Sequence, residues 1–158
     1  MPPLTVVTLN VSGLNLREKR WGTFSFLRDR LKAQVVLLSE THLTSAAVAA
    51  FWSKKWGVGK SDGEARAFWS VSDSVHTGGA AVLFHPSLPI KVIAVEYDPG
   101  RRGRWVRVRA VLFDREWSFT AVYAPAQAEE RVRIMTRPKW AVPRGGGSVR
   151  CWAVTSTV

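Results

Sequence analysis

The stretch that decides the fold is LTVVTLNVSGL, residues 4–14, together with VVLLSETHL, residues 35–43. Each begins with a run of β-branched and aliphatic residues that ends at polar ones, which is typical of a largely buried strand. Between the two runs, apolar residues follow the spacing of one helix face: Leu16, Trp21, Phe24, Leu27 and Leu31. A strand, a helix and a second strand in so short a segment predict a βαβ unit with parallel strands.

Local signals predict where the other elements begin and end. Asn15, three residues before Glu18, is expected to cap the first helix, which then runs to about Lys32. Thr44 is expected to cap a second helix over residues 46–56. Further along the chain, apolar runs and turn residues predict strands at 68–71, 79–85, 90–97, 105–113 and 117–123, and a helix at 127–135. This order of elements predicts an α/β fold.

Residues 136–158 differ in character from the rest of the chain. They contain four basic residues, no acidic one and three consecutive glycines, and they show no convincing periodicity. We therefore expect one partial domain at residues 4–135, followed by a divergent basic tail at 136–158. A shifted reading frame would explain such a tail. The alternative is a short terminal strand at residues 149–154.

The composition excludes several classes of protein. The chain of 158 residues is 46% hydrophobic and 22% charged, which is a globular balance. No apolar run is long enough to span a membrane, and the N-terminus lacks the pattern of a signal peptide. The lone cysteine, Cys151, excludes an internal disulfide. We expect a nuclear or cytoplasmic protein that is neither secreted nor attached to a membrane.

The charge is strongly basic, since 23 lysines and arginines oppose 12 acidic residues, and the net charge is +11. A basic surface favours a polyanionic partner, and the phosphate backbone of DNA is the partner we expect. The best candidates for contacts with phosphate are four arginines close together in sequence: Arg101, Arg102, Arg104 and Arg107. A solubilising surface or a solvated edge strand would explain the same charge. A small basic nucleic-acid-binding module is a further alternative.

Two polar residues follow the two strands of the predicted βαβ unit. Asn10 lies near the end of the first strand, and Glu40 lies just past the end of the second. Because parallel strands end at the same edge of a sheet, we expect the two residues to be neighbours there. Carboxylate and amide oxygens are the ligands that Mg²⁺ prefers. In the simpler alternative, Glu40 caps the next loop and Asn10 completes a turn.

Five short motifs, taken in order, resemble landmarks of one nuclease family: residues 8–14, 37–42, 78–84, 103–105 and 122–125. They read TLNVSGL, LLSETH, GGAAVLF, GRW and VYAP. The set resembles the endonuclease/exonuclease/phosphatase superfamily. It is most similar to the exonuclease III or apurinic-endonuclease-like domain of LINE-type, non-LTR retrotransposons.

The resemblance implies a two-sheet α/β sandwich of the exonuclease III or deoxyribonuclease I type. It also implies hydrolysis of DNA phosphodiesters with Mg²⁺ or Mn²⁺, and no small organic cofactor. By position, Glu40 would be the metal carboxylate, and Asn10 would support the metal or the scissile phosphate. Tyr123 would bind the phosphate or orient the nucleophile. Without the family, Tyr123 is explained as a strand-end aromatic residue beside Pro125.

The chain departs from the family downstream of Tyr123. The family continues with Gly-Asp-x-Asn and ends with Ser-Asp-His, which supply metal ligands, phosphate contacts and the general base. Here no aspartate follows Asp114, and no histidine follows His85. We therefore expect roughly the first half of the sandwich, about one sheet, with its apolar face uncovered. Two functions remain: an Mg²⁺-dependent endonuclease or exonuclease III-like hydrolase by family, or a non-catalytic, basic nucleic-acid-binding remnant.

Overall fold

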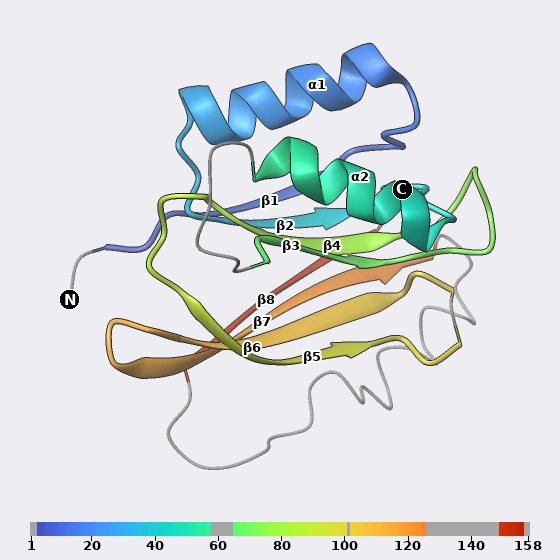
Figure 1. The fold of residues 1–158 in the computed structure, drawn as a ribbon. Coiled ribbons are helices and arrows are strands. Elements are labelled where there is room, and N and C mark those ends of the chain that lie inside the picture. The colour runs from blue at the N-terminus through green and yellow to red at the C-terminus, as the bar shows by residue number, and fades with distance from the viewer. Residues whose placement is uncertain (1–2, 58–64, 101, 126–148, 157–158) are drawn as a thin grey trace.

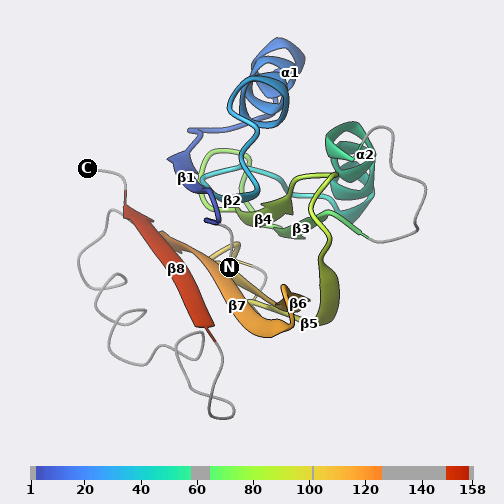
Figure 2. The same ribbon diagram turned by 90° about the vertical axis from the view of Figure 1, so that its left-hand side faces the viewer.

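In a computed structural model, the chain forms three layers: two helices cover one sheet, and that sheet packs on a second sheet (Figure 1). A view turned by 90° separates the helical layer, the upper sheet and the lower sheet (Figure 2). The structure describes residues 3–57, 65–100 and 102–125, and the backbone of 149–156. The helix expected at 127–135 lies outside these residues.

The first sheet confirms the βαβ unit. Its strands are β1 (Val6–Asn10), β2 (Val35–Ser39), β3 (Ala67–Ser70) and β4 (Ala80–Phe84), in the order β1-β2-β4-β3. β1 and β2 are parallel, whereas β4 is antiparallel to both of its neighbours. β2 is buried along its whole length, but β1 is only partly buried because it lies at the edge of the sheet. The expectation that both strands are buried is therefore wrong for β1.

The cap of each helix lies one residue later than expected. α1 spans Arg17–Ser25 and continues as a π-helical turn, η1 (Phe26–Arg30). Asn15 does not cap α1, because its side-chain amide donates to the carbonyl of His42 instead, at 3.3 Å. α2 spans Ala46–Trp56 and is capped by Ser45, not Thr44. Among the described residues, no helix combines the length and the apolarity that a membrane span requires.

The second sheet consists of β5 (Lys91–Tyr97), β6 (Trp105–Leu112), β7 (Arg115–Ala124) and β8 (Val149–Ser156), in that order. The first three strands pair antiparallel, and β8 pairs parallel to β7. β8 is the terminal strand that the alternative interpretation places at residues 149–154. Its register joins a segment of the expected basic tail to the sheet.

A core lies between the two sheets, so the expectation of one sheet with an uncovered apolar face is wrong. Phe84 of β4 packs edge-on against Phe68 of β3 and Phe119 of β7, with ring centroids 6.0 and 5.4 Å apart. Both sheets contribute fully buried aliphatic residues around these rings. Burial of such side chains contributes about 25 cal/mol per Å² of apolar surface. The physical reason is that the chain crosses to a second layer before β5, so its later hairpins cover the first sheet.

A second core lies between the first sheet and the helices. Trp56 packs edge-on against Phe24, and Trp52 packs edge-on against Trp69. The Trp56 indole N–H donates to the carbonyl of Phe84 at 2.7 Å, so the polar end of the ring is satisfied. Of the five residues expected on the apolar face of α1, Phe24 and Leu27 are buried, whereas the other three are at least 47% exposed. The helix lies over the edge strand, which leaves part of that face uncovered.

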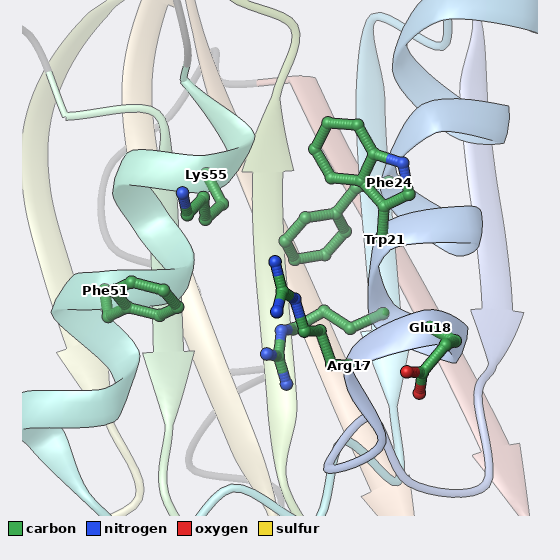
Figure 3. A pocket seen from close by; sticks show the side chains of 7 residues that line it. Arg17, Glu18, Trp21, Phe24, Phe51 and Lys55 are labelled. Carbon is green, nitrogen blue, oxygen red and sulfur yellow. The ribbon is translucent and has the colours of Figure 1, made fainter.

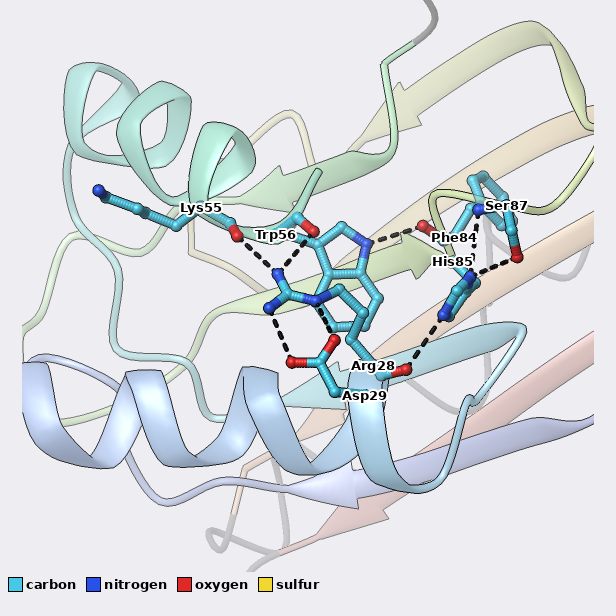
Figure 4. A network of polar contacts seen from close by, with 7 residues as sticks. All are labelled: Arg28, Asp29, Lys55, Trp56, Phe84, His85 and Ser87. Carbon is cyan, nitrogen blue, oxygen red and sulfur yellow. Dashed lines mark hydrogen bonds and ion pairs between the residues drawn. The ribbon is translucent and has the colours of Figure 1, made fainter. Parts of the chain in front are cut away.

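Polar contacts join the C-terminal end of α2 to the π-helical turn that follows α1 (Figure 4). The Arg28 guanidinium donates to the carbonyls of Lys55 and Trp56 at 2.8 and 3.1 Å, which caps the C-terminus of α2. Arg28 also pairs with Asp29 at 2.8 Å. Its own carbonyl lies 3.0 Å from Nε2 of His85. One residue therefore joins the first helix, the second helix and the end of β4.

We expect Arg28→Ala to lower the free energy of unfolding by about 1–3 kcal/mol, because charge-assisted bonds to two helix-end carbonyls are removed. Chemical denaturation followed by circular dichroism measures this change. Arg30→Ala is the matched control, since Arg30 is exposed at the end of the same π-helical turn. That change should stay within about 0.5 kcal/mol. Equal effects of the two substitutions would contradict the capping role of Arg28.

Candidate active site

The two strand ends of the βαβ unit meet as the sequence predicts. Asn10 is paired in register with Ser39, the residue before Glu40. Beyond the strands, the Val11 N–H donates to the Ser39 carbonyl at 3.0 Å, and the Gly13 N–H donates to the Glu40 carbonyl at 2.6 Å. Asn10 and Glu40 therefore lie together at the edge of the sheet formed by the C-terminal ends of β1 and β2, which we call the site edge. Their roles as ligands stay predictions.

The local conformations of these two residues differ. Glu40 is 6% exposed and has a φ of +56°, in the left-handed region that residues other than glycine rarely occupy. The Asn10 side-chain oxygen accepts a hydrogen bond from the Ser12 N–H at 2.9 Å. Asn10 thus completes an Asx turn, as the simpler alternative has it. The Ser12 hydroxyl also donates to the same oxygen, at 3.3 Å.

A third loop joins this edge at the start of β4. The His42 N–H donates to the carbonyl of Gly78 at 3.0 Å, and the Thr41 N–H donates to that of Gly79 at 3.3 Å. The Gly79 N–H in turn donates to the carbonyl of Gly103 at 2.9 Å. Gly103 precedes β6, so this bond links the first sheet to the second.

Arg104 and Tyr123 complete the edge from the second sheet. The Tyr123 N–H donates to the carbonyl of Arg104, and the guanidinium carbon lies 5.5 Å from the centre of the Tyr123 ring. Tyr123 is 3% exposed, near the end of β7. The described structure therefore brings Asn10, Glu40 and Tyr123 to one edge of the sandwich through a chain of backbone contacts.

Unusual backbone conformations gather at the same edge. Positive φ values occur here at Ser12, Gly13, Glu40, His42, Gly78, Gly79 and Gly103. Such conformations cost free energy in residues other than glycine and cluster at functional sites. In contrast, no other part of the described chain combines so many of them, since the remaining ones are single residues or a hairpin turn. The concentration supports a functional role for this edge.

Two buried polar atoms at this edge have no hydrogen-bond partner in the described structure: Thr41 Oγ1 and His42 Nε2. Burial lowers the pKa of His42, and the Glu40 carboxylate opposes that shift without cancelling it. The imidazole is therefore favoured in its neutral form. Neither atom could be singled out from the sequence, because their burial depends on how three loops pack.

The chemistry of the donor set fits a hard divalent cation. Glu40 offers a carboxylate and Asn10 an amide oxygen, and Mg²⁺ needs only one or two carboxylates because it keeps several waters. Among residues 3–57, 65–100 and 102–125, no cluster of three or more His, Cys, Asp or Glu could hold a metal. Any Mg²⁺ here would depend mainly on Glu40.

The predicted phosphate-binding arginines do not form one surface. Arg102 is exposed, and Arg104 is half-buried over Tyr123. Arg107 is 6% exposed and forms an ion pair with Glu96. Arg101 lies outside the described residues. Arg102 and Arg104 are therefore the members placed to meet a ligand at the site edge, because they adjoin Gly103.

Comparison with solved structures identifies the fold. TDP2 of D. rerio complexed with a single-stranded DNA product is similar over 96% of this chain, with a TM-score of 0.63 and 19% identity. The AP endonuclease LMAP from Leishmania major matches over 85%, with a TM-score of 0.53 and 14% identity. The catalytic domain of Xenopus laevis APE2 matches over 83%, with a TM-score of 0.52 and 18% identity. No family model matches the sequence.

The fold is thus the one that these solved structures share, which confirms the two-sheet α/β sandwich predicted from the motifs. The match is partial, because the chain covers 59%, 45% and 48% of the TDP2, LMAP and APE2 chains. The chain spans roughly half the length of the structures that it resembles. Identities below 20% establish the arrangement of the backbone and not the chemistry.

We expect Gly103→Ala to destabilise the protein by about 2–4 kcal/mol. Gly103 has a φ of +61°, and an added Cβ would overlap the Gly79 nitrogen and lie 2.7 Å from its Cα. Gly22→Ala is the matched control, since a Cβ there meets nothing within 4 Å. It should stabilise the helix by about 0.5–1 kcal/mol. Unfolding curves that show no difference between the two variants would exclude the close approach of the two sheets.

Proposed function

We propose that this chain is part of a DNA phosphodiester hydrolase of the endonuclease/exonuclease/phosphatase type. The observation that carries the proposal is the meeting of five motif-bearing segments at one edge, where Asn10, Glu40, Gly79, Gly103 and Tyr123 lie. The solved structures with this fold include AP endonucleases, and one is a complex with single-stranded DNA. A nuclear or cytoplasmic site of action is part of the proposal.

Each residue has a proposed role at this edge. Glu40, with support from Asn10, would hold Mg²⁺ or Mn²⁺, which would neutralise phosphate charge and polarise a bound water. Tyr123 would position the phosphate, and Arg104, stacked over its ring, would hold that ring and add positive charge. Arg102 extends the positive charge outward. Binding and charge neutralisation are thus within reach of these residues.

A positioned general base is missing from the same set. The sequence has no aspartate after Asp114 and no histidine after His85, so the two downstream motifs of the family have no counterpart. Loss of a positioned acid or base costs about 10²–10⁴-fold in rate. We therefore propose that the 158-residue chain binds DNA through its phosphates and does not hydrolyse it. The retrotransposon branch of the family is also a proposal.

We expect no nicking of supercoiled plasmid by the purified chain with Mg²⁺ or Mn²⁺, because the general base of the family's downstream motifs has no counterpart in this sequence. Gel electrophoresis over a long incubation measures this. Glu40→Ala is the control for contaminating nuclease, since any metal-dependent activity of the chain itself should require Glu40. Nicking by the wild-type protein that Glu40→Ala abolishes would overturn the proposal of a non-catalytic chain.

Affinity for DNA should fall with salt, because binding to phosphates releases condensed counterions. We expect the combined change Arg102→Ala and Arg104→Ala to flatten the slope of log affinity against log salt by about 0.9 for each phosphate that the two arginines neutralise. Fluorescence anisotropy with a labelled duplex measures the slope. Lys32→Ala is the control, since Lys32 is exposed just before β2, at the opposite edge of the sheet. A slope that changes equally with Lys32→Ala would argue against DNA binding at the site edge.

A further inference from the structure

A groove of about 710 Å³ runs between α1 and α2 on the outer face of the protein (Figure 3). Trp21 of α1 and Phe51 of α2 contribute rings from the two walls, and they are 57% and 50% exposed. Phe24 belongs to the core beneath and is 1% exposed. Large aromatic side chains exposed together at one groove are typical of a binding surface.

The groove is also basic. Three cationic side chains, Arg17, Arg20 and Lys55, line it with a single carboxylate, that of Glu18. Arg20 is held in place, because it donates to the carbonyl of Leu14 at 2.9 Å and its guanidinium lies 4.7 Å from the centre of the Trp52 ring. Burial lowers the pKa of Arg20, and the like charge of Arg17 adds to that effect. The groove therefore combines three cationic side chains with two exposed aromatic rings.

We propose that this groove binds an acidic amphipathic helix of a partner protein. A helix can place apolar side chains at positions i, i+3, i+4 and i+7 against Trp21 and Phe51, as helix-in-groove complexes do. Acidic residues that flank this apolar stripe would face Arg17 and Lys55. The recognition is thus a combination of apolar burial and opposite charge.

Other occupants fit the groove less well. Single-stranded nucleic acid would bind by stacking bases on open ring faces. Here the Lys55 ammonium lies 5.2 Å from the centre of the Phe51 ring and so occupies the face that a base would need. A second copy of the chain is disfavoured because each copy carries a net charge of +11.

The proposed helix site is separate from the candidate active site. The groove is built from the outer faces of α1 and α2, whereas Asn10, Glu40 and Tyr123 lie on loops and strand ends at the sheet edge. Helix binding in the groove therefore goes beyond the proposed hydrolase, and it stands whether or not DNA binds. Glu40→Gln should leave binding of a helical peptide unchanged, which makes the two proposals separately testable.

The test uses a fluorescent peptide of about 16 residues, long enough to form a helix, with leucines on one face and glutamates elsewhere. We expect the wild-type chain to bind it, and we expect a combined Trp21→Ala and Phe51→Ala change to weaken binding at least about tenfold. Phe26→Ala is the apolar control, because Phe26 is 47% exposed outside the groove. That control should bind within about twofold of wild type.

The role of charge has its own variants. A combined Arg17→Glu and Lys55→Glu change should weaken binding of the acidic peptide at least about tenfold and should restore binding to a peptide with lysine in place of glutamate. Arg30→Glu with Lys32→Glu is the control, since both residues are exposed outside the groove. Amide NMR shifts should map the acidic peptide to α1 and α2, and thermal melts should show that every variant is folded.

Three results would overturn the proposal. One is the absence of peptide binding by the wild-type chain. Another is equal binding of a peptide with glutamine in place of glutamate, because charge would then play no part. The third is a thymidine oligonucleotide that binds in a Trp21- and Phe51-dependent manner while the peptide does not, which would make the groove a nucleic-acid surface.

Discussion

The structure depends on one backbone hydrogen bond between its two sheets, from the Gly79 N–H to the Gly103 carbonyl at 2.9 Å. Side chains fill the rest of the space between the sheets, but here the two backbones touch, and no Cβ fits between them. Gly79 also packs on Thr41, the residue after Glu40. The close approach therefore fixes where the end of the first sheet lies relative to Arg104 and Tyr123. Without it, only side-chain packing would hold the motif residues of the two sheets in position.

The same close approach explains how the candidate site is assembled from motifs that are each weak evidence of function when taken alone. Glu40 is 6% exposed in a strained conformation, and a buried carboxylate is costly unless it is paired or bound to a metal. The surrounding loops hold it there through backbone bonds that survive most side-chain changes. A chain without the downstream catalytic residues can thus keep the architecture of the site.

Much of this arrangement could be predicted from the sequence, since hydrophobic runs and polar ends placed Asn10 and Glu40 at one sheet edge and the ordered motifs indicated the sandwich. The failures have physical causes. The caps of both helices lie one residue later than predicted, because Asn15 bonds to a distant carbonyl and Ser45 can cap as well as Thr44. The pairing of β8 with β7 joins segments far apart in sequence. The exposure of Trp21 could not be predicted either, because it depends on how α1 packs over the edge strand β1.

We propose that the loops around Glu40 form one divalent-cation site, and paramagnetic NMR with Mn²⁺ can test this claim. We expect trace Mn²⁺ to broaden the amide signals of Gly13, Thr41 and Gly79, while those of Lys32 and Phe84 at the opposite edge stay sharp. Glu40→Gln should abolish the broadening, because Mg²⁺-like ions need the carboxylate. Broadening that persists in Glu40→Gln, or that centres on another part of the protein, would contradict the claim.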